Sequence, residues 1–136
     1  MNRKRVLFLC TGNSCRSQMA EGFLRHMAGD RFEVFSAGVK PAQVNPLAIK
    51  VMAEAGIDIS KHRSKSVMEL IGQQFDYIVT VCGNAKQTCP VFPGKHEKIH
   101  WDLEDPAEAQ GSEKERMVVF RKTRDEIRKK IDEWRR

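Results

Sequence analysis

A short apolar run that leads into a cysteine-containing loop places the strongest constraint on the fold of this chain. The run Val6-Leu7-Phe8-Leu9 has the continuous apolar character of a buried parallel strand. Loop 10–17 follows directly, reads Cys-Thr-Gly-Asn-Ser-Cys-Arg-Ser, and is followed by apolar residues at helical spacing up to about Gly29. The sequence therefore predicts a strand, a loop and a helix, with the loop meeting the helix N-terminus.

The residues of this loop suit the binding of a tetrahedral anion by a nucleophilic enzyme. Backbone N–H groups at a helix N-terminus favour anions, and an arginine makes two parallel hydrogen bonds to an oxyanion. The same positive surroundings favour the thiolate form of Cys10. We expect Cys10 to be the nucleophile, Asn13 to hold the loop in a left-handed conformation and Cys15 to pack inward. The expected oxyanion-binding residues are Thr11, Gly12, Asn13, Ser14, Cys15 and Arg16.

Strands and helices alternate along the rest of the chain. Three further strands are expected at 32–35, 77–81 and 98–101, with Ser36-Ala37-Gly38 closing the first of them. Helices are expected from Asn45-Pro46 to about Gly56, from Ser66 through 70–71, and from about Ser112 onward. Short connections between alternating elements predict an α/β fold, a single domain over residues 1–136 with a doubly wound, four-stranded parallel sheet and helices on both faces. Cys10, Cys82 and Asp105 all follow strands, so they should meet at one edge of the sheet.

The charge pattern limits the classes of partner. The formal net charge is +6, but the basic residues of the C-terminal helix are interleaved with acidic ones, which is typical of a solvated helix face and not of a nucleic-acid site. A positive field suits small anionic substrates instead.

The apolar stretch after the basic N-terminus is too short for a signal peptide, and no segment approaches membrane-spanning length. We expect a cytoplasmic monomer that binds neither membrane nor nucleic acid.

Four cysteines could serve structure, metal binding or redox chemistry. They are Cys10, Cys15, Cys82 and Cys89. In a cytosolic chain, metal binding or redox catalysis is favoured over a disulfide framework. The spacings of five and seven residues differ from those of zinc knuckles. Cys82 and Cys89 could instead be core thiols, and Asp105 could simply cap a turn before Pro106.

Several motifs together resemble the low-molecular-weight protein tyrosine phosphatases. Their signature is a cysteine, five residues and then Arg-Ser, which loop 10–17 matches. Asp105-Pro106 matches the position of that family's general acid, and 36–38, 56–60 and 62–64 resemble its framework. The resemblance covers essentially the entire chain. It implies the phosphatase fold, with Asp105 as the general acid.

Two departures from the phosphatase pattern point to another branch of that fold. Ala107 and Glu108 follow Asp105-Pro106, where phosphatases that act on phosphotyrosine supply an aromatic wall. Segment 82–89 adds a cysteine pair that ester hydrolysis does not require. The set of Cys10, Cys82 and Cys89 is similar to that of the thioredoxin-coupled arsenate reductases.

The resemblance implies a thiol cascade with arsenate as substrate and thioredoxin as reductant. The expected catalytic residues are Cys10, Arg16, Cys82, Cys89 and Asp105, supported by a hydrogen bond from Ser17 to the Cys10 thiolate. The expected working segments are the oxyanion loop 10–17, the redox segment 82–89 and the general-acid loop 102–108. No cofactor is expected. Asn13, Glu21 and Ser36 offer oxygen ligands for the monovalent-cation site of some relatives, but Lys65 stands where a carboxylate would complete it, so we also expect no metal.

Two alternative functions remain open at this stage. A phosphatase acting on phosphotyrosine or small phosphate esters would need Cys10, Arg16 and Asp105 but neither Cys82 nor Cys89. A non-enzymatic thiol redox sensor would use the Cys82–Cys89 pair and would not need Asp105. The cascade also predicts that 83–95 is the most mobile internal segment and changes shape on oxidation.

Overall fold

The protein contains one parallel sheet whose strand order places the N-terminal strand inside. The computed structural model describes residues 3–136, apart from the side chain of Asn84. The sheet order is β2-β1-β3-β4 and every pairing is parallel, as predicted. Residues 1–2 of the expected domain lie outside the described residues. The strands are β1 (Lys4–Cys10), β2 (Phe32–Gly38), β3 (Tyr77–Thr80) and β4 (Glu97–His100).

The helices begin where the sequence supplies capping side chains. The Asn45 side chain accepts a hydrogen bond from the Leu47 N–H, and Ser112 forms a capping box with Glu115. No helix within residues 3–136 combines the length and the apolar composition of a membrane span. The α-helices are α1 (Arg16–Ala28), α2 (Pro46–Glu54), α3 (Gly83–Thr88) and α4 (Glu113–Trp134), and the 3₁₀ turns are η1 (Val67–Glu69) and η2 (Pro106–Glu108).

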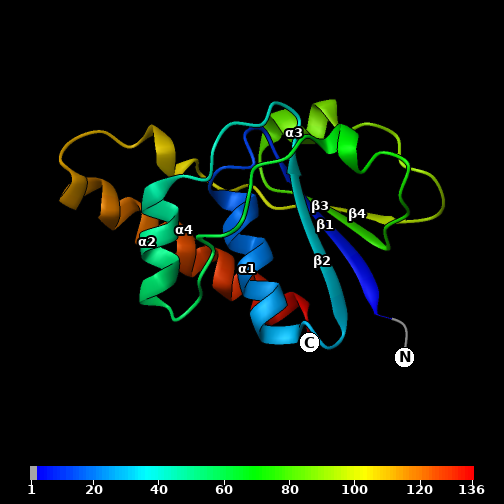
Figure 1. Ribbon diagram of the computed structural model, residues 1–136, viewed down its shortest axis with the longest axis horizontal. Helices are drawn as coiled ribbons and strands as arrows, with labels where there is room; N and C mark the ends of the chain where they lie inside the picture. Colours follow the sequence, from blue (N-terminus) through cyan, green and yellow to red (C-terminus); the bar gives the residue numbers. More distant parts are fainter. Residues whose placement is uncertain (1–2) are drawn as a thin grey trace.

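The two faces of the sheet are covered unequally (Figure 1). Successive strand residues point to opposite faces. On one face, Trp134 of α4 contacts Tyr77 and Phe32, and α1 packs on β1 and β2. On the other face lie Ile78 and Thr80, which line a hollow together with Lys86 of α3. Long helices therefore cover the first face, whereas the six-residue α3 and neighbouring loops cover the second.

One local expectation was wrong. Ser36-Ala37-Gly38 continues β2 rather than closing it, because these residues pair with Phe8, Leu9 and Cys10 at the end of β1. Segment 82–89 also contains a helix that the sequence pattern did not indicate. Its six residues lack an apolar stripe, and its start depends on the Cys82 sulfur, which accepts a hydrogen bond from the Ala85 N–H.

Candidate active site

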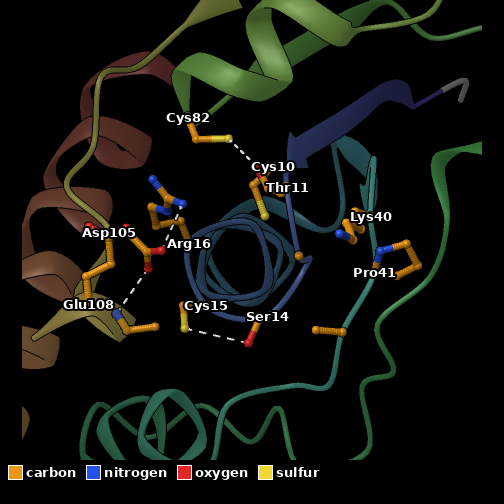
Figure 2. Close-up of a pocket in the computed structure, with 13 residues that line it drawn as sticks. Cys10, Thr11, Ser14, Cys15, Arg16, Lys40, Pro41, Cys82, Asp105 and Glu108 are labelled. Atoms are coloured by element: carbon orange, nitrogen blue, oxygen red, sulfur yellow. Dashed lines mark hydrogen bonds and ion pairs between the residues drawn. The ribbon is translucent and has the colours of Figure 1, made fainter.

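The candidate active site lies at the carboxyl ends of β1 and β3, where the strand order changes direction. Ligands bind at this point in open parallel sheets, because the connections on the two sides diverge and leave a crevice. A cleft of about 700 Å³ is found here, and Cys10, Cys82, Arg16 and Asp105 all line it (Figure 2). The predicted meeting of three post-strand segments is therefore observed.

Loop 10–17 wraps around the Cys10 sulfur. The Asn13 N–H points at Cys10 Sγ over 3.1 Å, and Ser17 Oγ lies 2.8 Å from the same sulfur. Asn13 has a positive φ of 49°, the left-handed conformation expected for it. The loop thus supplies hydrogen bonds that suit a negatively charged sulfur, and the contact expected for Ser17 is present.

A buried polar network holds this loop in place. The Asn13 side-chain amide donates to Ser17 Oγ over 2.8 Å and to Ser36 Oγ over 3.0 Å. The Gln18 amide donates to the Asn13 backbone and side-chain oxygens, and Lys65 N–H donates to the same side-chain oxygen. Sequence reasoning did not assign Gln18 a supporting role. The sequence could have indicated this role, because Gln18 is a polar residue in an amphipathic helix directly after the loop. The Gln18 side chain is fully buried in the structure.

Gly38 lies against the backbone of the loop and has room for no side chain. A Cβ at this position would lie 2.6 Å from the Thr11 carbonyl oxygen and 2.9 Å from the Asn13 nitrogen. We expect Gly38→Ala to displace the loop amides and weaken phosphate binding by about ten- to a hundredfold, the effect of losing one charge-assisted hydrogen bond. Isothermal titration with phosphate measures this. Gly72→Ala is the matched control, because a Cβ there meets nothing within 4 Å; equal affinity in the two variants would contradict the prediction.

Arg16 and Asp105 are paired across the cleft. Arg16 Nη2 lies 3.6 Å from Asp105 Oδ2, and Arg16 Nη1 donates to the Leu103 carbonyl oxygen over 2.9 Å. The other Asp105 oxygen accepts a hydrogen bond from the Ala107 N–H. Asp105 therefore caps the turn at Pro106 and also faces the cleft, so the structural and functional interpretations are both compatible with its position.

Cys82 faces the oxyanion loop from the N-terminal end of α3. Its sulfur lies 3.3 Å from Thr11 Oγ1 and is largely buried (Figure 2). The Ala85 N–H points at the same sulfur over 3.4 Å. Both contacts would also stabilise a negatively charged sulfur. Cys82 is therefore on the same side of the sheet edge as Cys10 and shares its cleft.

Cys89 is the one expected catalytic residue that does not line the cleft. It lies at the other end of α3, half-buried, and its thiol donates to the Pro90 carbonyl oxygen over 3.5 Å. Burial raises the pKa of Cys89, and the charge of Lys98 opposes this effect. All four cysteines are free in this structure. Cys89 must therefore move before it can reach Cys82.

Cys15 differs from Cys10 although both belong to the same loop. Both residues are 3% exposed, but the Asn13 N–H and Ser17 contacts are made to Cys10, whereas burial raises the pKa of Cys15 to about 12. Its thiol therefore stays protonated near neutral pH, as befits the inward packing that was expected.

The position considered for a monovalent cation carries positive side chains. The buried Glu21 carboxylate accepts a hydrogen bond from Ser36, and Arg25 Nη1 lies 2.6 Å from it. Lys65 Nζ lies 4.0 Å from the same carboxylate. Two side-chain cations therefore already neutralise Glu21, which removes the electrostatic reason to bind a metal cation there.

Comparison with known proteins agrees with this geometry. Residues 5–136 match the family model for the low molecular weight phosphotyrosine protein phosphatases. The chain belongs to that family. Among its relatives within the family, the chain is 50% identical over 131 residues to an arsenate reductase of Halalkalibacterium halodurans, covering 96% of this chain and 94% of that protein.

Solved structures described as arsenate reductases are also similar to this chain. A structure described as an arsenate reductase in the oxidized state is 32% identical, has a TM-score of 0.82, and matches 96% of this chain and 95% of its own. A thioredoxin-dependent arsenate reductase of Corynebacterium glutamicum is 34% identical with a TM-score of 0.62. That alignment covers 96% of this chain and 62% of the Corynebacterium chain.

Proposed function

We propose that this protein reduces arsenate to arsenite in arsenic detoxification and that thioredoxin returns it to the reduced state. The observation that carries the proposal is the presence of two thiols, Cys10 and Cys82, in one cleft with Arg16 and Asp105. Arsenate reductases that match nearly the whole chain support it. The thioredoxin-dependent relative supports the choice of reductant.

In the first step, Cys10 attacks the arsenic atom of the bound arsenate. Loop amides and Arg16 hold the oxyanion and stabilise the charge that develops on its oxygens. An S–As bond forms and an As–OH bond breaks. Asp105, protonated for this step, gives its proton to the departing hydroxide, which leaves as water. In the structure Arg16 is paired with Asp105. When arsenate binds, its negative charge attracts the Arg16 guanidinium away from Asp105 and toward the substrate.

In the second step, Cys82 attacks the Cys10 sulfur. The S–As bond breaks, and its electron pair stays on arsenic, which is thereby reduced from As(V) to As(III) and leaves as arsenite. The two sulfurs are oxidised to a Cys10–Cys82 disulfide. The hydroxyl of Thr11 and the N–H of Ala85 support Cys82 as a thiolate before this attack.

In the third step, Cys89 attacks Cys82 and releases Cys10. A helical segment separates the Cα atoms of residues 82 and 89 by about 10 Å, since each residue rises about 1.5 Å. A disulfide needs a Cα separation of about 4.4–6.8 Å. Helix α3 must therefore unwind, which exposes the new Cys82–Cys89 disulfide to thioredoxin. The mobility expected for segment 83–95 follows from the same requirement.

A phosphatase is the second candidate function, because the loop, Arg16 and Asp105 also suit phosphate monoesters. Membership of the phosphatase family favours it. The residues that line the cleft include Pro41, Ala42 and Ala107 but no aromatic side chain to hold a phosphotyrosine ring. A residual activity on small phosphate esters is therefore compatible with the main proposal. A non-enzymatic thiol sensor is less well supported, since it leaves Arg16 and Asp105 without a role.

The test is a steady-state assay with the intact protein, arsenate, thioredoxin, thioredoxin reductase and reduced nicotinamide cofactor. We expect arsenate-dependent oxidation of the nicotinamide cofactor and one arsenite formed per cofactor oxidised. Hydrolysis of a small phosphate ester, measured in parallel, should be far slower. Ester hydrolysis without arsenate-dependent turnover would instead establish the phosphatase. We also infer that the protein acts as a cytoplasmic monomer. Size-exclusion chromatography with light scattering tests its oligomeric state.

A further inference from the structure

A second hollow lies beside α3 and shares no lining residue with the catalytic cleft. It has a volume of about 410 Å³, in the range of small-molecule sites. Three elements form it: β3, the end of α3 and β4. The residues that line it are Ile78, Thr80, Lys86, Cys89, Lys98, Ile99 and His100.

The hollow combines an apolar floor with cationic walls. The β3–β4 register pairs Ile78 with Lys98 and Thr80 with His100, so these side chains point to the same face. Thr80 Oγ1 lies 2.8 Å from His100 Nδ1, which fixes the imidazole against the floor. Lys86 enters from α3, and no carboxylate is among the residues that line the hollow. A molecule bound here should therefore carry negative charge.

The wall of this hollow also presents a nucleophile. Cys89 is half-buried and free; burial raises the pKa of its thiol, and the charge of Lys98 partly offsets this rise. Because Cys89 is at the far end of α3 from Cys82, the resting protein offers its sulfur to this hollow and not to the catalytic cleft. A ligand in the hollow would thus contact the sulfur that the relay uses last.

We propose that this hollow is a modification site at which small, carboxylate-bearing disulfides form a mixed disulfide with Cys89. The Cys89 thiolate attacks one sulfur of the bound disulfide. The S–S bond of the small molecule breaks, a Cys89–S–S–R bond forms, and the second half leaves as a thiolate that takes up a proton. Cys89 is oxidised and the small disulfide is reduced. Its carboxylates lie against Lys86 and Lys98.

A capped Cys89 cannot attack Cys82, so the modification would hold the relay at the Cys10–Cys82 disulfide. This consequence rests on the proposed function, whereas the modification itself does not. The modification of Cys89 is therefore measured in the full chain carrying Cys10→Ser and Cys82→Ser, which reduces no arsenate. Its result does not depend on whether the protein without these substitutions is an arsenate reductase, which the arsenate assay tests separately.

The test compares glutathione disulfide, which carries carboxylates, with cystamine, which carries ammonium groups. The rate at which each disulfide modifies Cys89 is measured by peptide-mapping mass spectrometry. It is divided by the rate at which the same disulfide reacts with a free cysteine derivative, which corrects for the different intrinsic reactivities of the two disulfides. We expect the normalised rate for glutathione disulfide to exceed that for cystamine by about fivefold, the combined effect of charge pairs with two exposed lysines, Lys86 and Lys98. The ratio should fall at high salt.

Lys98→Gln and Lys95→Gln provide a matched pair of variants. Both lysines are exposed, but only Lys98 lines the hollow. We expect Lys98→Gln to lower the ratio of the two rates by about two- to fivefold and Lys95→Gln to leave it unchanged. A ratio near one in the parent protein, or an equal fall in both variants, would overturn the proposal, since the charge selectivity would then be absent or would not come from the hollow.

Discussion

Cys10→Ser should abolish arsenate reduction while leaving oxyanion binding largely intact. The serine hydroxyl is a far weaker nucleophile at neutral pH, and an oxygen at this position cannot form the disulfide with Cys82. We expect kcat to fall by at least about 10⁴-fold, as for the removal of other enzymatic nucleophiles. The coupled thioredoxin assay measures the loss, and phosphate titration measures binding by the loop amides and Arg16.

The other cysteine of the loop provides the comparison. Cys15 is protonated near neutral pH because burial raises its pKa to about 12, so it cannot replace Cys10 as the nucleophile. Cys15→Ser should therefore still support repeated turnover, although a polar group replaces a buried thiol. Loss of all turnover in Cys15→Ser, together with residual turnover in Cys10→Ser, would reverse the assignment of the nucleophile.

Removal of each thiol of the α3 segment should stop the reaction at a different stage. Cys82→Ser should release no arsenite, because nothing can attack the Cys10 sulfur once it is bonded to arsenic. Cys89→Ser should release one arsenite per protein molecule and then stop with a Cys10–Cys82 disulfide. Quantifying arsenite in a single-turnover reaction, with non-reducing peptide mapping of the disulfide, distinguishes these two results. Steady-state turnover should be absent in both variants.

Ester hydrolysis supplies the control for these variants. Cys10, Arg16 and Asp105 remain in both proteins, so any residual hydrolysis of a small phosphate ester should survive. Continued arsenate turnover by Cys89→Ser with thioredoxin would contradict the three-thiol cascade, since the Cys10–Cys82 disulfide would then be reduced directly.

Hydrogen exchange offers a second check of the cascade. Equal protection of the backbone amides of 83–95 in the reduced and oxidised proteins would contradict the unwinding of α3.

Much of the site followed from local sequence. Loop 10–17 is continuous in sequence, and a cysteine, a glycine, an asparagine and an arginine at these spacings restrict both its conformation and its chemistry. The strand pattern also predicted that Cys10, Cys82 and Asp105 would meet, because parallel strands bring their carboxyl ends to one edge. The structure places all three in one cleft.

Other features depend on contacts between distant residues and were not predictable from spacing. Gln18 supports Asn13 only because α1 packs so that this polar side chain points inward. The extension of β2 to Gly38 depends on its pairing with Cys10. A residue pattern cannot reveal such roles, since each is defined by a partner that folding supplies.

The sequence by itself determined the alternation of strands and helices and predicted the nucleophile and the oxyanion loop, because each depends on residues close together along the chain. Only the tertiary structure decided that Cys89 faces a cationic hollow separate from the cleft that Cys82 shares with the loop. The physical reason is the short helix between Cys82 and Cys89, which holds the two residues at its opposite ends.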